Sequence, residues 1–371
     1  MNRKPFLMKP TGKDYIWGGS RLNDDFSKNI DMSPLAETWE CSTHSDGPSF
    51  AYGGIFDGKS LSEILKEHPE FLGTHPKTKG ELPILIKFID AKKDLSVQVH
   101  PDDEYAQKHE NGQMGKSEMW YVLDARSDSH LVYGLNYDME ADTIRHSIEN
   151  GTLEKHLQKV PIKPDDVFFI KAGTIHAIGA GALVAEIQES SNLTYRLYDY
   201  DRVDKQGNKR QLHIDKALAV ADLKGAVKPK QPIHSLKYSQ GCATELLCRC
   251  KYFEVNRMLI NTERVRQLVE YRADEASFRV LLCTNGCGTL FINETEYIKV
   301  FRGDCIFFPA DSVPLKSTAK CNFWILEDNT KIDWDSVFHT VILLKLFLTI
   351  NNSEKSCNSL RSDRQLFPLN K

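Results

Sequence analysis

Short runs of apolar and β-branched residues recur along most of this chain, with turn residues between them. Before residue 200 they include PILIKFIDA, LSVQVHP, EMWYVLDA, SHLVYGL, DVFFIKAG, LVAEIQES and TYRLYDYD. After residue 242 they resume with ATELLCRC, FEVNRMLI, SFRVLLCTN, DCIFFPA and NFWILED. Many short strands at regular spacing are typical of a β-sandwich or a jelly-roll barrel. The pattern therefore predicts a mainly β protein.

Helical periodicity interrupts this pattern at residues 60–73, 142–160 and 212–223, where apolar residues recur every three or four positions. Gly151 is expected to break the second stretch into two pieces. All three stretches precede the second group of strands. We therefore expect the helices to decorate the first of two β domains.

The domain boundary is expected in GAVKPKQPIHSL, a segment rich in proline and lysine that indicates a linker. A length of 371 residues suits two domains. We predict a first domain at 1–235, a smaller β domain at 236–335 and an atypical tail at 336–371. A short match between PDDVFFIKAGTIH and RGDCIFFPADSVP suggests two related barrels, of which only the first has the final histidine.

The charge and hydropathy of the chain indicate which classes of partner it does not bind. Lys plus Arg number 48 and Asp plus Glu 51, a net charge of −3, so no basic surplus exists to pair with a nucleic-acid backbone. The start lacks an apolar signal region. The apolar run at 337–350 is shorter than the roughly twenty residues that a membrane helix needs. We expect neither a nucleic acid nor a membrane as partner.

The nine cysteines show no regular spacing, which argues against a disulfide framework and for thiols in a reducing cytoplasm. A zinc site on Cys248, Cys250, Cys283 and Cys287 would have poor spacing for a structural zinc motif. We therefore expect a cytoplasmic protein whose cysteines are small core residues.

The run SVQVHP contains the first candidate for chemistry. Because side chains alternate along a strand, Val97 and Val99 share one face while Gln98 and His100 share the other. Pro101 has no N–H for a sheet and ends the run. An amide and an imidazole at the end of a strand could be plain structure or half of a metal site.

Two further predicted strands carry residues that could also be metal ligands. Glu118 shares a strand face with Lys116, and His176 opens a strand after a turn. Alone, each has an ordinary explanation as a hydrogen-bonded core residue or a solvated face. Imidazole and carboxylate are zinc ligands, and catalytic sites keep one position open. Together with Gln98 and His100, these residues would form a metal centre inside one barrel.

Positive charge near these residues indicates an anionic substrate. Lys87 lies in an otherwise apolar strand, where a lysine is costly unless it meets a cavity or a partner. Lys116 and Arg196 would add positive charge on neighbouring strands. A phosphorylated or carboxylated small molecule fits that surplus.

In combination, these blocks resemble the type I mannose-6-phosphate isomerases (phosphomannose isomerases) in their shorter bacterial form. The resemblance is carried in order by PFLMKPTGKDYIWGGSRL, AETWECSTHSDGPS, SVQVHPDDEYA, GKSEMWYVLDA, KAGTIHAIGAGALVAEIQESSNLTYRLYDYDR and LHIDKALAV. It spans roughly residues 5–328, and the chain beyond about 335 does not resemble the family.

The resemblance implies two cupin-type jelly-roll domains, the first catalytic and elaborated with helices and the second without catalysis. It implies one zinc ion per chain. Carried over residue by residue, the zinc ligands fall on His100, Glu118 and His176, with Gln98 as a ligand seen in related longer enzymes. The active-site arginine falls on Arg196, and active-site lysines fall on Lys116 and Lys87.

The reaction that the resemblance implies is the reversible interconversion of mannose 6-phosphate and fructose 6-phosphate through a cis-enediol. The proton-transfer base stays open between Glu186, Lys116 and a zinc-bound water. One alternative is a cupin dioxygenase, because two histidines and a carboxylate also hold iron(II). Another is a sugar-phosphate-binding cupin without turnover, against which the presence of Lys116 and Arg196 beside the ligands argues.

Overall fold

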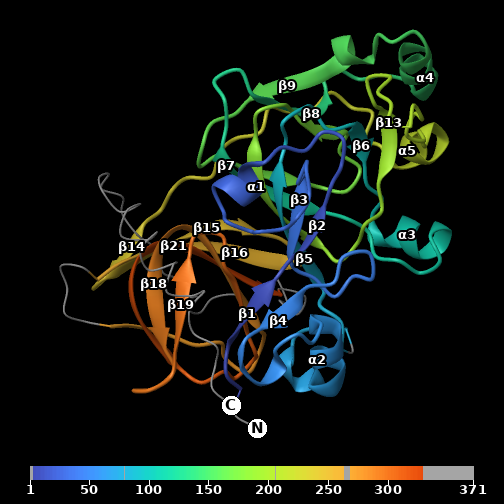
Figure 1. Cartoon of the computed structure of the whole chain (residues 1–371). Helices are drawn as coiled ribbons and strands as arrows, with labels where there is room; N and C mark the ends of the chain where they lie inside the picture. The colour runs from blue at the N-terminus through green and yellow to red at the C-terminus, as the bar shows by residue number, and fades with distance from the viewer. Residues whose placement is uncertain (1–2, 79, 205, 263–267, 329–371) are drawn as a thin grey trace, which may run out of the picture. The chain divides into compact units, whose positions relative to one another are not determined.

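The computed structural model describes residues 3–78, 80–204, 206–262 and 268–328 (Figure 1). The chain forms two compact units. The first, here called the central unit, comprises Gly12–Trp39 and Ile84–Pro232. The second, the terminal unit, comprises Met1–Thr11, Glu40–Pro83 and Ile233–Lys371.

These units do not follow the order of the chain, unlike the predicted domains at 1–235 and 236–335. The reason is strand pairing, since β1 (Phe6–Lys9) lies between β20 (Cys305–Phe308) and β4 (Phe50–Tyr52). The division into a catalytic and a non-catalytic domain stays a prediction. The predicted tail at 336–371 lies outside the described residues.

The central unit is built from two antiparallel sheets. One has the order β10 (Val167–Ile170), β7 (Glu118–Asp124), β12 (Leu183–Glu189), β5 (Ile84–Asp90), β3 (Glu37–Cys41) and β2 (Thr11–Lys13). The other has the order β13 (Tyr195–Tyr198), β6 (Val97–Val99), β11 (His176–Ile178), β8 (His130–Leu135) and β9 (Leu157–Pro161).

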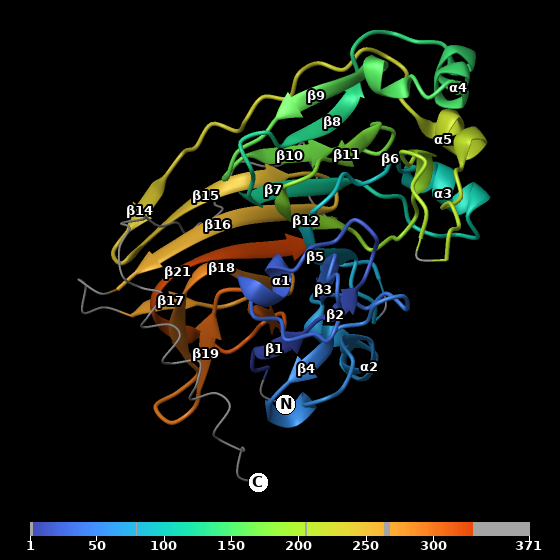
Figure 2. The same ribbon diagram turned by 45° about the horizontal axis from the view of Figure 1, so that its top comes forward.

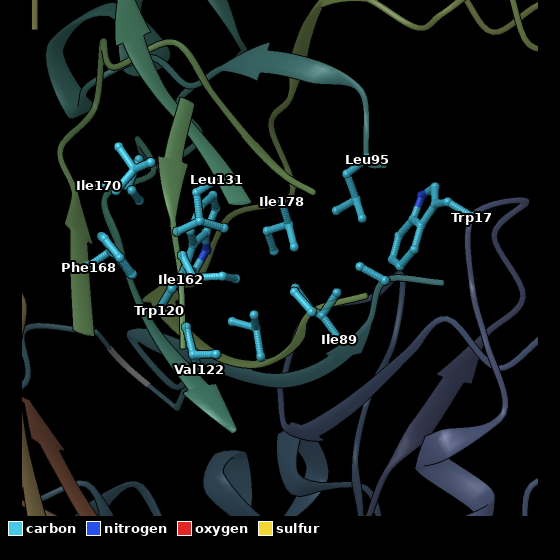
Figure 3. Close-up of a cluster of buried hydrophobic side chains, with 14 of the residues drawn as sticks. Trp17, Ile89, Leu95, Trp120, Val122, Leu131, Ile162, Phe168, Ile170 and Ile178 are labelled. Carbon is cyan, nitrogen blue, oxygen red and sulfur yellow. The ribbon is translucent and has the colours of Figure 1, made fainter. Parts of the chain in front are cut away.

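The two sheets share one hydrophobic core. Its members come from β5, β7, β10 and β12 of the first sheet and from β8, β9 and β11 of the second. Figure 3 shows Trp120 of β7 in one cluster with Leu131 of β8 and Ile178 of β11. All three side chains are nearly or fully excluded from water, so burial of this apolar surface holds the sheets together.

A second core lies on the other face of the five-stranded sheet. Val97 and Val99 of β6 pack there with residues of α4 (Ala141–Glu149) and α5 (Ile214–Val220). Figure 2 shows the two helices next to each other at one end of this sheet. The alternation predicted for SVQVHP is confirmed, because Gln98 and His100 are left to face the space between the sheets.

The terminal unit has one ten-stranded antiparallel sheet. Its main order is β14 (Lys237–Ser239), β15 (Cys242–Arg249), β16 (Phe253–Asn261), β21 (Leu315–Asp328), β18 (Arg279–Phe291), β20, β1 and β4. In addition, β17 (Val269–Tyr271) pairs with β21, and β19 (Tyr297–Phe301) pairs with β18. The prediction of a mainly β fold is confirmed in both units.

Two of the three predicted helical stretches are confirmed. Residues 60–73 contain α2 (Leu61–Glu67) and the 3-10 helix η2 (Pro69–Phe71), and a capping box between Ser60 and Glu63 fixes the start of α2. Residues 212–223 contain α5.

The stretch 142–160 is helical only in part. It breaks at Gly151, as expected, but the prediction is wrong for its last residues, which form a strand. After α4 the chain makes the 3-10 helix η3 (Leu153–His156) and then β9, which pairs with β8. The sequence prediction also missed α3 (Asp103–His109), whose start is capped by Asp102, and the short helices α1 (Arg21–Asp24) and η1 (Gly54–Phe56).

Among the described residues, six cysteines are free thiols, namely Cys41, Cys242, Cys248, Cys250, Cys283 and Cys305. Cys287 is disulfide-bonded, so the expectation of thiols throughout is wrong at that position. Among the described helices, none is long and apolar enough to cross a membrane.

Candidate active site and metal centre

Three strands of the central unit bring His100, Glu118 and His176 together. His176 begins β11 and lies opposite Gln98 of β6, so that His100, two residues further along, reaches the same end of the sheet. Glu118 begins β7 in the other sheet. The three ligand atoms lie within 4.8 Å of one another, and all three residues are buried.

Hydrogen bonds to the backbone orient both imidazoles. The Nδ1 of His100 lies 2.7 Å from the carbonyl oxygen of Leu193, and the Nδ1 of His176 lies 2.8 Å from that of Thr174. Because a carbonyl only accepts, each Nδ1 carries the proton and each Nε2 presents a lone pair. These Nε2 atoms lie 3.6 and 3.3 Å from the two carboxylate oxygens of Glu118.

Burial sets the protonation of the cluster. Burial, reinforced by the charge of Lys116, lowers the pKa of His100 well below its usual value. Burial also lowers the pKa of His176 to about 4. Both imidazoles are therefore neutral near pH 7, which is the form that binds metals. Burial and the neighbouring Glu186 raise the pKa of Glu118 to about 7.

The cluster has the properties of an incomplete coordination sphere. The Nε2 of His100 and both carboxylate oxygens of Glu118 are buried. Among the described residues, the Oε2 of Glu118 has the ammonium group of Lys116 at 2.8 Å, while the other two atoms make no hydrogen bond. Leaving such a group unsatisfied costs about 1–3 kcal/mol. A cation where the three ligand atoms converge would satisfy all of them. Two imidazoles and a carboxylate are a known set for a catalytic divalent metal, so the residues fit one.

Gln98 borders this cluster from the side. Its Nε2 lies 3.4 Å from the Nε2 of His176. The nitrogen and oxygen of an amide exchange places by a half-turn of the group. The same side chain can therefore offer its oxygen towards the cluster.

A cavity of about 270 Å³ opens beside the cluster within the central unit. Five of the residues predicted from the sequence line it, namely Lys87, Gln98, Lys116, Glu186 and Arg196. Lining residues that the prediction missed include Tyr15, Trp17, Glu37, Asn192, Thr194 and Arg210.

Glu186 links the two buried lysines. It lies opposite Lys87 on β5 and opposite Trp120 on β7. Its Oε1 is 3.0 Å from the Nζ of Lys87 and 3.7 Å from that of Lys116, and its Oε2 accepts a hydrogen bond of 2.9 Å from Trp120. Burial alone would raise the pKa of Glu186, but Lys116 and Lys87 lower it to about 2. Glu186 is therefore ionised.

Lys116 connects this ion-pair network to the metal cluster. Its Nζ lies 2.8 Å from the Oε2 of Glu118. The ammonium group thus stands between a candidate metal ligand and the Glu186 carboxylate. This position suits proton transfer to a substrate in the cavity.

Arg196 occupies a different part of the cavity wall. It lies opposite Gln98 in the sheet, and its Nε donates to the hydroxyl of Ser96 over 3.2 Å. Its Nη1 donates to the carbonyl of Gln211 over 2.8 Å. Among the described residues, no carboxylate forms a salt bridge with Arg196. Its positive charge therefore remains available to a ligand.

Of the cavity residues that the prediction missed, Glu37 could have been recognised from the sequence, whereas Arg210 could not. Glu37 lies in the buried strand ETWEC, where its Oε2 accepts a hydrogen bond of 2.8 Å from Trp39. A carboxylate in such a strand is costly without a partner, so Glu37 gave the same kind of sequence signal as Lys87. Arg210 lies in a polar loop without strand periodicity, so its place in the cavity wall has no signal in the sequence.

Comparisons with known proteins identify the family of this chain. Residues 6–133 match the family described as phosphomannose isomerase type I, catalytic domain. The chain is similar to two proteins of Bacillus subtilis. The probable mannose-6-phosphate isomerase GmuF is 36% identical over 86% of this chain and 98% of its own. Mannose-6-phosphate isomerase ManA is 39% identical over 83% of this chain and 94% of its own.

A solved structure gives the same result. The mannose 6-phosphate isomerase from Bacillus subtilis matches with a TM-score of 0.79 and 33% identity, over 87% of this chain and 99% of that one. This likeness covers both units. The chain therefore belongs to the type I mannose-6-phosphate isomerase family.

Proposed function

We propose that this protein interconverts mannose 6-phosphate and fructose 6-phosphate with a zinc ion held by His100, Glu118 and His176. The observation that carries the proposal is the buried set of converging ligand atoms beside a cavity lined by cations. The similar Bacillus proteins are named as mannose-6-phosphate isomerases, which supports the substrate.

The metal centre has a defined part in this reaction. When bound, zinc would supply a Lewis acid that polarises the oxygens at C1 and C2 of the open-chain sugar. His100 and His176 enter as neutral ligands and Glu118 as the single anionic one. Gln98 would complete the set with its amide oxygen.

Isomerisation moves a proton between C1 and C2 through a cis-enediol, and the chain must supply the group that carries it. We assign this transfer to the pair of Lys116 and Glu186, which both line the cavity. Glu186 is ionised and can accept a proton, although a low pKa makes it a weak base. Lys87 keeps the Glu186 carboxylate in place.

Arg196 has a binding role in this proposal. Its guanidinium group is anchored to Ser96 and to the backbone, so it is already oriented when the substrate arrives. A fixed cation without a carboxylate partner suits an anionic substrate. Arg196 therefore holds the sugar phosphate, which is the small-molecule partner, against the cavity wall. We also propose that the protein acts in the cytoplasm, which the mostly free thiols support.

A coupled assay tests the proposal. The assay follows fructose 6-phosphate formed from mannose 6-phosphate before chelation, after chelation and after zinc is restored. We expect activity to be lost to the chelator and regained with zinc. No conversion by folded, zinc-loaded protein would favour a binding protein without turnover. Oxygen uptake with iron(II) would instead favour the dioxygenase alternative.

A further inference from the structure

The cavity has two chemically different ends, and strand β6 connects them. Ser96, Gln98 and His100 alternate with the buried valines, so they face the interior in that order. His100 belongs to the metal cluster, whereas Ser96 accepts the hydrogen bond from Arg196. At about 3.3 Å per residue, the extended chain separates Ser96 from His100 by roughly 13 Å.

The end near Ser96 carries a second arginine. Arg210 lines the same cavity as Arg196. Its Nε donates to the Oδ2 of Asp199 over 2.8 Å, and its Nη2 donates to the Oδ1 over 2.5 Å. Its Nη1 has no acceptor among the described residues. Arg210 is thus held by one edge of its guanidinium group, while another N–H remains available.

Asp199 pairs with two of the arginines at this end, Arg210 and Arg202. The buried Asp199 also accepts a hydrogen bond of 2.5 Å from Arg202. Arg196 feels the charges of Arg210, Asp199 and Arg202, and burial together with Arg210 lowers its pKa. Two guanidinium groups on one carboxylate, with Arg196 on the same cavity wall as Arg210, leave a surplus of positive charge. The lysines at the metal end, by contrast, form ion pairs with Glu37, Glu118 and Glu186.

We propose that Arg210, positioned by Asp199, joins Arg196 in binding the phosphate group of the substrate, so that the sugar lies along β6 with C1 and C2 towards His100. This inference rests on the proposed function and deepens it. A phosphate monoester is a compact dianion whose oxygens accept several N–H groups, which two arginine edges offer. The carbon chain from C2 to C6 then spans the part of the cavity beside Gln98.

The test compares binding and turnover in the full-length, zinc-loaded protein. Sorbitol 6-phosphate serves as the binding probe, because it carries the phosphate but has no carbonyl group to isomerise. We expect Arg210→Ala to weaken its binding roughly 10- to 100-fold by calorimetry. For mannose 6-phosphate, KM should rise by a similar factor while kcat stays within about twofold, as for loss of uniform binding.

Matched variants keep the result interpretable. Lys209→Ala removes the adjacent cation, which is exposed and pairs with Asp201 outside the cavity, and it should change neither quantity. Arg210→Lys retains the charge and should recover part of the affinity, which also covers the case in which the alanine variant fails to fold.

Two results would overturn the inference. One is sorbitol 6-phosphate binding that is unchanged in folded Arg210→Ala and Arg210→Lys. The other is a fall in kcat at constant affinity. If sorbitol 6-phosphate binds in an Arg210-dependent way but mannose 6-phosphate is not converted, the phosphate site stands and the proposed isomerase activity fails.

Discussion

The Nε2 of His100 and the Oε2 of Glu118 lie 3.6 Å apart in the interior of the central unit. Among the described residues, the Nε2 of His100 makes no hydrogen bond, and the Oε2 of Glu118 has the ammonium group of Lys116 at 2.8 Å. The imidazole nitrogen and the carboxylate oxygen are both acceptors, so neither can donate to the other and both gain from a shared cation. The protonation of Glu118 then becomes part of metal binding, because a cation and a proton compete for the same carboxylate.

Zinc affinity should fall about tenfold for each pH unit below pH 7. In the metal-free protein, Glu118 takes up a proton as the pH drops through about 7, and zinc must displace it. The pKa of His176 is about 4, so this histidine adds no slope between pH 5 and 7. Competition with a chromogenic chelator at several pH values measures the slope. A hundredfold change per unit in this range would mean that a histidine titrates as well.

Arg196→Ala should lower kcat/KM at least about 100-fold while zinc content stays near normal, since Arg196 lies outside the metal cluster. Metal analysis of the purified variant, alongside the coupled assay, checks both parts. Loss of zinc together with activity would make Arg196 structural instead. Lys209→Ala is the control for removing a nearby positive charge.

Local pattern accounts for much of the site. Alternation along SVQVHP was enough to separate Val97 and Val99 from Gln98 and His100, because it depends only on strand geometry. The oddity of a lysine in an apolar strand likewise identified Lys87. Both inferences need no knowledge of which strands are neighbours.

Such local patterns could not predict the register of the strands or the position of the loops. Glu186 lies between Lys87 and Trp120 because β12 pairs with both β5 and β7, a relation set by the whole fold. Arg210 reaches the cavity through an ion pair with Asp199. Residues 157–161 became a strand through pairing with β8, although their spacing also suited a helix. In each case tertiary contacts decided the outcome.

Variants of Lys116 and Glu186 should separate the two candidate proton carriers. Removing the group that transfers the proton should lower kcat roughly 10²- to 10⁴-fold, whereas removing its partner should cost less. Glu186→Gln keeps the hydrogen bond to Trp120 and changes mainly the charge, and Lys116→Met keeps the length of the side chain. Exchange of the C2 proton with solvent deuterium, followed by NMR, reports the transfer directly. Equal losses in both variants would mean that the pair acts as one unit.

The stability of the fold should depend on Glu189, a fully buried carboxyl group outside the cavity. Its Oε1 accepts a hydrogen bond of 2.7 Å from the backbone N–H of Ser117. Burial and the nearby Asp103 raise the pKa of Glu189 to about 8. Between its ordinary pKa near 4.5 and pH 8, the folded state keeps a proton that the unfolded state releases. The free energy of unfolding should therefore fall as pH rises through this window and level off above it.

Glu189→Gln should remove this loss, because the amide is neutral at every pH and its oxygen can still accept from Ser117. Relative to wild type, we expect the variant to gain of the order of 2 to 4 kcal/mol between pH 5 and pH 8.5. Urea unfolding of both proteins at both pH values measures the gain. The metal centre is the same in wild type and variant, so its own pH dependence cancels when their free energies of unfolding are subtracted. Glu104→Gln, at an exposed position of α3, is the control and should show no such gain. A constant difference between Glu189→Gln and wild type across this range would mean that Glu189 is already ionised in the fold.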